Sequence, residues 1–382
     1  MNKKELELYI HIPFCVRKCS YCDFLSAPAT EQTREAYMAA LFAEIGGRAK
    51  DYSDRTVTSI FIGGGTPSLL SGEQIGQLMD CIREQFAMAQ DAEITMEVNP
   101  GTASAEKLRN FYTAGINRLS IGMQSAQAEE LKNLGRIHDF EGFCQVYREA
   151  VEAGFTNINV DIMSGLPGQT LASYRDTLEK VLHLEPMPQH ISAYSLIVEE
   201  GTPFAAMAER GELPLPEEET ERAMYEETIE VLAKYGFHRY EISNYARDGY
   251  ECRHNVGYWI RRDYLGFGIG AASLIDNVRF QNEKSLGAYL AHPLESREEE
   301  QTLTVQDRME ETMFLGLRLT RGVSCVDFAE QYGRTVEEVY GEVIARNVAD
   351  GLLTVTERKE NQKKDRFLAL TKRGLDLSNY VM

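Results

Sequence analysis

The chain has 382 residues, of which 43% are hydrophobic and 26% are charged, so it can bury the core of one large domain or of two smaller ones. Its 59 acidic residues outnumber its 40 basic residues, and the formal net charge of −19 disfavours general binding to nucleic acid. The sequence has no apolar run of membrane-spanning length and no signal-peptide core at its start, so we expect a cytoplasmic protein.

Predicted strands alternate with predicted helices over the first two thirds of the sequence. The first strand, LELYIHI, places its Leu and Ile side chains on one face and Tyr9 and His11 on the other, and a helical pattern follows from about residue 31 to residue 48. The theme repeats through VTSIFI, EITMEV, INRLSIGMQS, NINVDIMSGLPGQ and QHISAYSLIV. About six such βαβ units predict a parallel sheet, either an incomplete (β/α)6 barrel or an open doubly wound sheet, with ligands at the carboxyl ends of the strands.

The pattern changes after about residue 300. Three helical segments precede a predicted two-stranded wing, LLTVTE and RFLALT, and a final helix. This order is typical of a small winged-helix module, and its acidic helices favour a packing or protein-binding role over DNA binding. We therefore divide the chain into a partial barrel with an appended segment, residues 1–300, and a C-terminal domain, residues 301–382.

The loop after the first strand contains CVRKCSYC, in which Cys15, Cys19 and Cys22 are separated by three and two residues. Structural zinc needs four protein ligands, and His11 is the nearby candidate for the fourth. A [4Fe-4S] cluster held by three thiolates leaves one iron without a protein ligand. That iron can chelate S-adenosyl-L-methionine (SAM) through its amino and carboxylate groups, and the cofactor then carries the difficult chemistry. The spacing alone leaves both zinc and iron–sulfur open.

The segment FIGGGTPS follows the second predicted strand. Gly64 and Gly65 lack side chains, so their backbone can approach a ligand closely, and the same glycines also suit a tight strand-to-helix turn. A P-loop is excluded because no Gly-Lys-Ser/Thr follows. Together with CVRKCSYC, and with Tyr21 directly before the third cysteine, this segment resembles the radical SAM family.

Further motifs resemble the radical SAM subgroup that contains oxygen-independent coproporphyrinogen III oxidase (HemN) and the haem chaperone HemW. They are YIHIPFCVRKCSYCDF, GGGTPSLL, SIGMQS, LGRIH, DIMSGLPGQT and YEISNYA. The resemblance implies a radical SAM barrel that holds a [4Fe-4S] cluster and SAM, with the three cysteines on the cluster. Residues that match cofactor-binding positions are Tyr9, Tyr21, Gly64, Gly65, Thr66 and Glu97, the last on the SAM ribose. In the oxidase, a second SAM position is lined by residues that match Gln124, Arg136 and Asp161.

Two features separate the sequence from the oxidase. Phe24 stands where the oxidase motif has a further cysteine, and only fourteen residues precede Cys15, whereas the oxidase has a long segment there that helps to bind the porphyrinogen. A third feature favours the chaperone, because HNVGYW, residues 254–259, matches its HNxxYW motif. Imidazole is a common axial ligand of haem iron, and the neighbouring aromatic rings offer flat surface to a macrocycle. A histidine beside aromatic rings is also typical of packed, hydrogen-bonded structure.

The resemblance therefore predicts a haem chaperone that binds a cluster, SAM and haem and passes the haem to acceptor haemoproteins, with peripheral association with membrane-bound acceptors. His254 is the predicted haem-binding residue, and His138 and His238 are weaker candidates. The alternative is the oxidase reaction, in which coproporphyrinogen III is decarboxylated to protoporphyrinogen IX. We expect the glycine-rich segment YLGFGIGAAS to lie against the sheet edge and close the site.

Overall fold

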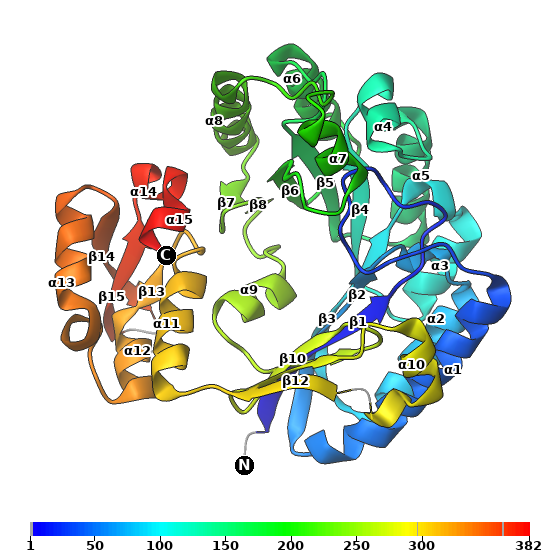
Figure 1. Ribbon diagram of the computed structural model, residues 1–382, viewed down its shortest axis with the longest axis horizontal. Coiled ribbons are helices and arrows are strands. Elements are labelled where there is room, and N and C mark those ends of the chain that lie inside the picture. Colours follow the sequence, from blue (N-terminus) through cyan, green and yellow to red (C-terminus); the bar gives the residue numbers. More distant parts are fainter. Residues whose placement is uncertain (1–2, 296, 361–362) are drawn as a thin grey trace.

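The computed structural model describes residues 3–295, 297–360 and 363–382, and within these ranges twelve strands form one mixed sheet (Figure 1). Six parallel strands at its centre are adjacent in chain order: β1 (Lys4–Ile12), β2 (Arg55–Gly64), β3 (Ala87–Val98), β4 (Arg118–Gln124), β5 (Ile158–Ser164) and β6 (His190–Ser195). A doubly wound sheet reverses its strand order, and this sheet does not. The structure thus confirms the incomplete (β/α)6 barrel.

Helices cover the outer face of the six strands. They are α1 (Glu31–Arg48), α2 (Gly72–Gln85), α3 (Ala105–Thr113), α4 (Ala128–Leu134), α5 (Phe140–Ala153), α6 (Leu171–Leu182) and α8 (Glu218–Lys234). Helix α7 (Pro203–Glu209) lies instead beside the loop after β1, where the N–H of Phe204 donates to the carbonyl of Ser20 at 3.0 Å. Thr202 caps α7 through its hydroxyl, and a proline occupies the first turn of this helix. Short 3₁₀ turns are η1 (Ala49–Tyr52), η2 (Pro67–Leu69), η3 (Pro100–Thr102) and η4 (Pro293–Glu295). No helix in the described ranges combines the length and the apolar character needed to cross a bilayer.

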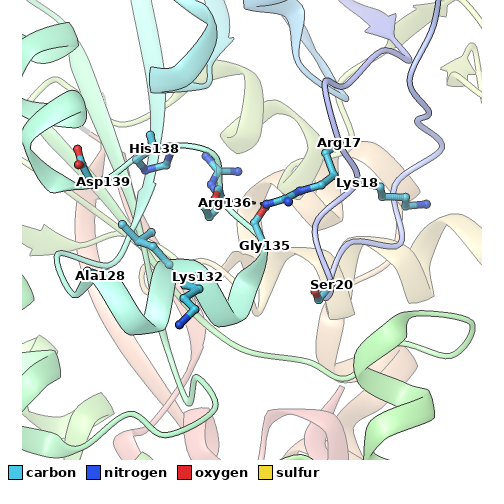
Figure 2. A pocket seen from close by; sticks show the side chains of 10 residues that line it. Arg17, Lys18, Ser20, Ala128, Lys132, Gly135, Arg136, His138 and Asp139 are labelled. Atoms are coloured by element: carbon cyan, nitrogen blue, oxygen red, sulfur yellow. Dashed lines mark hydrogen bonds between the residues drawn. The ribbon is translucent and has the colours of Figure 1, made fainter.

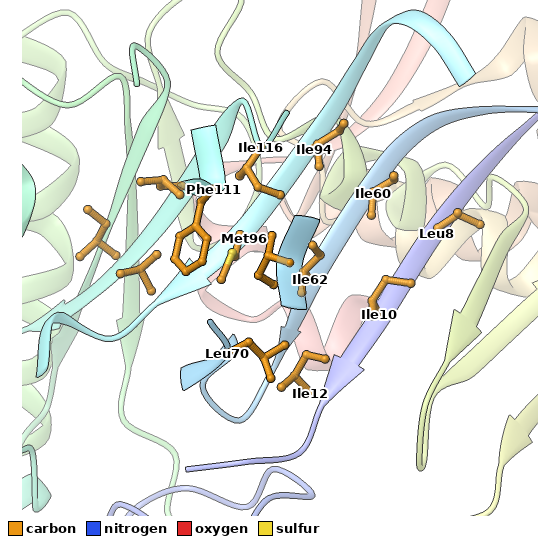
Figure 3. Close-up of a cluster of buried hydrophobic side chains, with 14 of the residues drawn as sticks. Leu8, Ile10, Ile12, Ile60, Ile62, Leu70, Ile94, Met96, Phe111 and Ile116 are labelled. Carbon is orange, nitrogen blue, oxygen red and sulfur yellow. The ribbon is translucent and has the colours of Figure 1, made fainter. Parts of the chain in front are cut away.

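The core lies between the strands and these helices. Branched side chains of β1, β2 and β3 point outward and are almost fully buried under α1 to α3. Figure 3 shows Leu8, Ile10, Ile12, Ile60, Ile62, Ile94 and Met96 in this layer. Because successive side chains of a strand point to opposite faces, the residues that alternate with these apolar ones face the barrel interior. This interior row is mostly polar, and it includes Glu97, Ser120, Asn159, Asp161 and Ser192.

Short strands extend the sheet at both ends. Beyond β6 lie β8 (Asn244–Ala246) and then β7 (His238–Arg239) at the edge. Beyond β1 lie β9 (Tyr264–Phe267), β10 (Ala272–Ile275), β11 (Val278–Asn282) and, at the other edge, β12 (Arg297–Thr302), whose side chains are all exposed. The segment YLGFGIGAAS contains β9, which pairs in parallel with β1, so it lies against the sheet edge as expected.

The appended segment also contains two helices, α9 (Arg253–Trp259) and α10 (Leu286–Ala291). Figure 1 shows α9 on the open side of the barrel, between β8 and β10. It contacts β2 on one side and the C-terminal part of the chain on the other. Helix α9 therefore bridges the gap that a closed barrel would fill with strands.

The C-terminal part has its own small apolar core, built around Phe328, Leu353 and Leu368. Its elements are α11 (Val305–Gly316), β13 (Val323–Ser324), α12 (Cys325–Tyr332), α13 (Val336–Ala349), β14 (Leu353–Glu360), β15 (Lys363–Leu370), α14 (Lys372–Asp376) and α15 (Ser378–Val381). The predicted helices and wing are present, and β13 adds a third strand that pairs with β15. The predicted domain boundary at residue 300 stays a prediction, and it falls inside β12.

The C-terminal part is joined to the barrel by buried charges. Glu311 on α11 accepts a hydrogen bond from Nε of Arg261 at 2.8 Å and pairs with Nη2 of Arg279 at 2.8 Å. The guanidinium of Arg318 lies over the ring of Trp259, 4.4 Å from its centroid. Helix α9 and the residues after it are thus held by both parts of the molecule.

Candidate functional site

A cavity of about 400 Å³ opens into the barrel interior and reaches the carboxyl ends of the parallel strands. This is the position that strand topology predicts for a ligand site. Most of the residues singled out in the sequence line this cavity: Cys15, Cys19, Tyr21, Cys22, Gly64, Gly65, Thr66, Glu97, Gln124, Arg136 and Asp161. Tyr9 and His254 are not among its lining residues.

The three cysteines lie on a loop that leaves β1 and is tied down at several points. The backbone N–H of Cys15 donates to the carbonyl of Ala27 at 3.2 Å, and that of Ser20 donates to Leu134 at 3.0 Å. The hydroxyl of Thr66 donates to Sγ of Cys15 at 3.5 Å, and Nη1 of Arg136 lies 3.8 Å from Sγ of Cys19. These donors stabilise negative charge on sulfur, as a metal-bound thiolate requires.

The residues around the loop fit an iron–sulfur cluster better than zinc. His11, the candidate fourth zinc ligand, uses Nε2 to contact the carbonyl of Leu25 at 2.9 Å and Nδ1 to contact the Tyr9 hydroxyl at 3.0 Å. Within the described ranges, no three His, Cys, Asp or Glu side chains gather closely around one point. In a [4Fe-4S] cluster each thiolate binds a different iron, so the ligands need not gather around a single metal ion. The three cysteines of this loop, which line one cavity, would hold such a cluster.

The glycine segment packs directly against the cysteine loop. Gly65 donates its N–H to the carbonyl of Ile12 at 2.9 Å, and a Cβ at this residue would lie 2.7 Å from the carbonyl oxygen of Phe14. Gly64 has a φ of +112°, which side-chain-bearing residues rarely adopt. The glycine segment therefore makes a close backbone approach to the cysteine loop, and its predicted approach to a ligand stays a prediction.

Two carboxyl groups face the cavity from β3 and β5, the strands on either side of β4. Oε2 of Glu97 accepts the N–H of Gly64 at 3.0 Å, and burial, with a smaller contribution from Asp161, raises the pKa of Glu97 to about 8. Burial also raises the pKa of Asp161, although hydrogen bonds from Asn159, Ser192 and Ser120 oppose this rise. A cationic ligand in the cavity would favour the ionised form of both groups.

Gln124 and Arg136 meet at the end of β4. A β-bulge between Gly122 and Gln124 brings Gln124 to a φ of 69°, and a bulge of this kind re-aims a side chain beside a site. Arg136 follows α4 and donates from Nη2 to the carbonyl of Gly122 at 2.7 Å. Gln124 and Arg136 thus lie beside Gly122, and both line the cavity together with Asp161, the third residue matched to the second SAM position.

Tyr9 lies behind the cavity wall. Its ring stacks on that of Phe61 at a centroid distance of 6.5 Å, and Phe61 itself lines the cavity. Tyr9 is therefore separated from the cavity by one side chain. Its predicted place beside SAM stays a prediction.

His254 is buried in the first turn of α9, with only 1% of its surface exposed. Its Nδ1 lies 2.8 Å from the hydroxyl of Ser59 and its Nε2 lies 3.0 Å from that of Tyr258, so both ring nitrogens have partners. Burial lowers the pKa of His254 to about 3, which keeps the imidazole neutral. The next residue, Asn255, lines the cavity instead. The haem-binding role of His254 stays a prediction.

The weaker histidine candidates lie elsewhere. Nε2 of His138 contacts the carbonyl of Met123 at 3.2 Å, and Nε2 of His238 contacts Glu251 at 2.7 Å. Neither lines the cavity.

A second hollow of about 410 Å³ lies on the outer side of the cysteine loop (Figure 2). Its lining includes the basic residues Arg17, Lys18, Lys132 and Arg136. Figure 2 shows Arg17 reaching across the hollow to the carbonyl of Gly135, at 2.6 Å from Nη2. The surface beside the loop is therefore basic in a protein whose net charge is −19, and it attracts anions that the rest of the molecule repels.

Sequence reasoning missed several cavity residues, namely Phe61, Arg118, Ser120, Asn159, Ser192, Tyr194 and Asn255. A signal for some of them was available. Arg118 and Ser120 precede Gly122 and Gln124 by even numbers of residues on β4, so the two-residue period of a strand places all of them on the same face. Asn255 had no such signal, because the sequence did not predict α9.

Comparison with known families gives two matches. The Radical SAM superfamily matches residues 9–181, and the HemN C-terminal domain matches residues 303–377. A protein named heme chaperone HemW from Bacillus subtilis (strain 168) is 39% identical over 356 residues, which are 91% of this chain and 93% of that protein. The HemW protein of Lactococcus lactis subsp. lactis (strain IL1403) is 36% identical over 382 residues, which are 100% of this chain and 97% of the relative.

The fold also matches a solved structure described as coproporphyrinogen III oxidase (HemN) from Escherichia coli, a radical SAM enzyme. The TM-score is 0.84 at 28% sequence identity, and the match covers 99% of this chain and 89% of that chain. The similarity therefore includes both the partial barrel and the C-terminal part.

Replacing Gly65 by Ala should dislodge the cysteine loop, because the new Cβ meets backbone atoms of Phe14, one residue before Cys15. We expect iron bound per chain after anaerobic reconstitution to fall several-fold, and the free energy of unfolding to fall by about 1–3 kcal/mol. Gly76→Ala on α2 is the matched control, since its Cβ meets no atom within 4 Å; it should keep its iron. Full iron in Gly65→Ala would contradict this account.

Replacing Glu97 by Gln should stabilise the cluster-free protein in a pH-dependent way. The pKa is about 8 in the folded chain against an ordinary value of 4.5, so the unfolded chain ionises first and wild-type stability falls as pH rises between these values. We expect the variant to exceed wild type by a few kcal/mol at pH 8 and by little at pH 4.5, measured by denaturant unfolding. Exposed Glu152→Gln is the control. An equal difference at both pH values would contradict the burial of this carboxyl.

Proposed function

Because this chain belongs to the radical SAM superfamily and, within it, to the HemW family, we propose that it binds a [4Fe-4S] cluster, SAM and haem and transfers the haem to acceptor haemoproteins. The observation that carries the proposal is the shared cavity, in which three thiols and all the matched SAM-contact residues except Tyr9 line one space. Full-length similarity to HemW proteins supports the haem part. The acceptors are haemoproteins, including ones bound to the membrane.

Each group around the cavity has a defined task in this proposal. Cys15, Cys19 and Cys22 would hold the cluster, which when bound supplies an open iron for SAM and an electron for cleaving its sulfonium bond. Glu97 would hold the ribose of SAM. The backbone of the glycine segment fixes the loop against the strand.

The haem part depends on HNVGYW. A neutral imidazole is the form that binds a metal, and the low pKa of His254 keeps the ring in that form. Both ring nitrogens have hydroxyl partners, so binding to iron requires the loss of the contact with Ser59 or Tyr258. Haem binding in this proposal is therefore coupled to a local rearrangement of α9.

The second candidate function is oxygen-independent oxidation of coproporphyrinogen III. The observation that favours it is the fold match with the oxidase over nearly the whole chain. The exposed Phe24, at the place of the further cysteine in the oxidase motif, speaks against it. The chaperone function is therefore the one we put forward.

The test is a haem titration of the anaerobically reconstituted protein, followed by the Soret band. We expect one haem per chain, an affinity at least tenfold weaker in His254→Gln, and no conversion of coproporphyrinogen III with SAM and a reductant. Glutamine retains hydrogen-bonding groups toward Ser59 and Tyr258, so the variant should fold.

The control is His238→Gln, which changes a partly exposed histidine outside the cavity and should bind haem as wild type does. Turnover of coproporphyrinogen would refute the chaperone function in favour of the oxidase. Unchanged haem affinity and an unchanged Soret band in His254→Gln would show that HNVGYW is not the haem site.

A further inference from the structure

Arg118 is a buried cation that the proposed SAM site does not use. It is the first residue of β4, and its side chain points into the barrel because Leu119 points outward to the core. Only 2% of its surface is exposed, and it lines the cavity. Within the described ranges, its guanidinium takes part in no hydrogen bond or ion pair, and its Nε is buried without a partner.

The acidic groups nearest to Arg118 are engaged elsewhere. Glu93 accepts the backbone N–H groups of Arg253 and His254 at 3.1 and 3.2 Å, and Asp161 accepts Nδ2 of Asn159 at 2.7 Å. Their negative charge favours the guanidinium at a distance. It gives the buried Nε no acceptor among the described residues, and a buried donor without an acceptor is costly.

Other buried arginines in the chain show what a structural role looks like. The side chain of Arg55 is 2% exposed and pairs with both Asp263 and Asp276, at 2.5 and 2.6 Å. The side chain of Arg261 is 3% exposed and pairs with Glu311. Arg118 has the same burial without the carboxylate, which points to a carboxylate that comes from outside the chain.

The surroundings of Arg118 suit such a group. A guanidinium presents a planar fork of donors that matches a carboxylate in two parallel hydrogen bonds. Neutral hydrogen-bonding residues, Ser120, Asn159, Ser192 and Asn255, line the same cavity. Of the other arginines that line it, Arg17 binds the carbonyl of Gly135 and Arg136 binds that of Gly122. Gly122 is four residues beyond Arg118 on β4, so the backbones of these two residues lie about 13 Å apart. Arg118 therefore offers a second anion position, at the end remote from the cysteines.

We propose that Arg118 receives the carboxylate of a ligand bound deep in the cavity. The identity of this carboxylate rests on the proposed function, under which it is a propionate group of haem. The alternative is the amino-acid carboxylate of a second SAM molecule. Glu93 links this position to α9, since it lies near Arg118 and caps the helix that carries His254.

The first experiment tests the anion position without haem. Thermal unfolding of the reconstituted full-length protein is followed in sodium propionate and in sodium chloride at equal ionic strength. We expect propionate to raise the unfolding midpoint of wild type, to raise it less in Arg118→Lys, and to have no effect on Arg118→Met. In chloride, Arg118→Met should unfold at the wild-type midpoint or above it, because an unpaired buried charge has been removed.

Arg55→Met is the matched control, because it removes a paired guanidinium of equal burial. It should unfold at a lower midpoint and keep its response to propionate. If Arg118→Met is destabilised like Arg55→Met, or fails to fold, Arg118 is structural and the proposal is overturned. A wild type that ignores propionate, or an Arg118→Met that still responds, overturns it as well.

The second experiment identifies the source of the carboxylate. We expect wild type to bind haem at least tenfold more tightly than haem dimethyl ester, and Arg118→Met to bind the two equally. If wild type instead binds two SAM molecules per chain and Arg118→Met binds one, the carboxylate belongs to SAM. If wild type binds no haem, the haem function is refuted. The response to propionate still decides the role of Arg118, because that experiment contains no haem.

Discussion

Each of the six parallel strands buries one face under helices, and this requirement determines where polar chemistry can lie. Because successive side chains point to opposite faces, the residues that alternate with Ile10, Ile62 and Met96 must face the barrel interior. Branched apolar side chains fill the interior of a closed eight-stranded barrel. Here the barrel is open, α9 bridges the gap, and the interior row of polar residues surrounds a cavity in place of a second core.

This polar interior lowers stability until a ligand enters. The carboxyl of Asp161 has hydrogen-bond donors around it. Burial holds Glu97 largely protonated, and Nε of Arg118 has no acceptor in the part of the chain that the structure describes. Apolar side chains of similar volume would give a more stable fold. Cationic and anionic groups of bound ligands would complete these electrostatics, so ligand binding and stability are coupled in this molecule.

The sequence predicted the repeating architecture well because its signal is local and periodic. The helix predicted from residue 31 to residue 48 is α1, and LLTVTE and RFLALT form the wing strands β14 and β15. Motifs and the family resemblance also led to residues that line the cavity, although many other lining residues were missed. The features that the sequence did not predict depend on contacts between distant parts of the chain. No local pattern predicts that α9 bridges the open side, or that Phe61 stands between Tyr9 and the cavity. The interior position of Arg118 was readable from strand alternation, but its lack of a partner was not.

The two ends of the twelve-stranded sheet have a consequence for the molecule in solution. An open barrel, unlike a closed one, exposes strand edges, and exposed edges invite pairing between copies and aggregation. One edge here is β7, only two residues long, and the other is β12, whose sequence REEEQT is dense in charge and fully exposed. Shortness protects the first edge and electrostatic repulsion the second, so the sheet ends within one molecule and does not grow into a fibre.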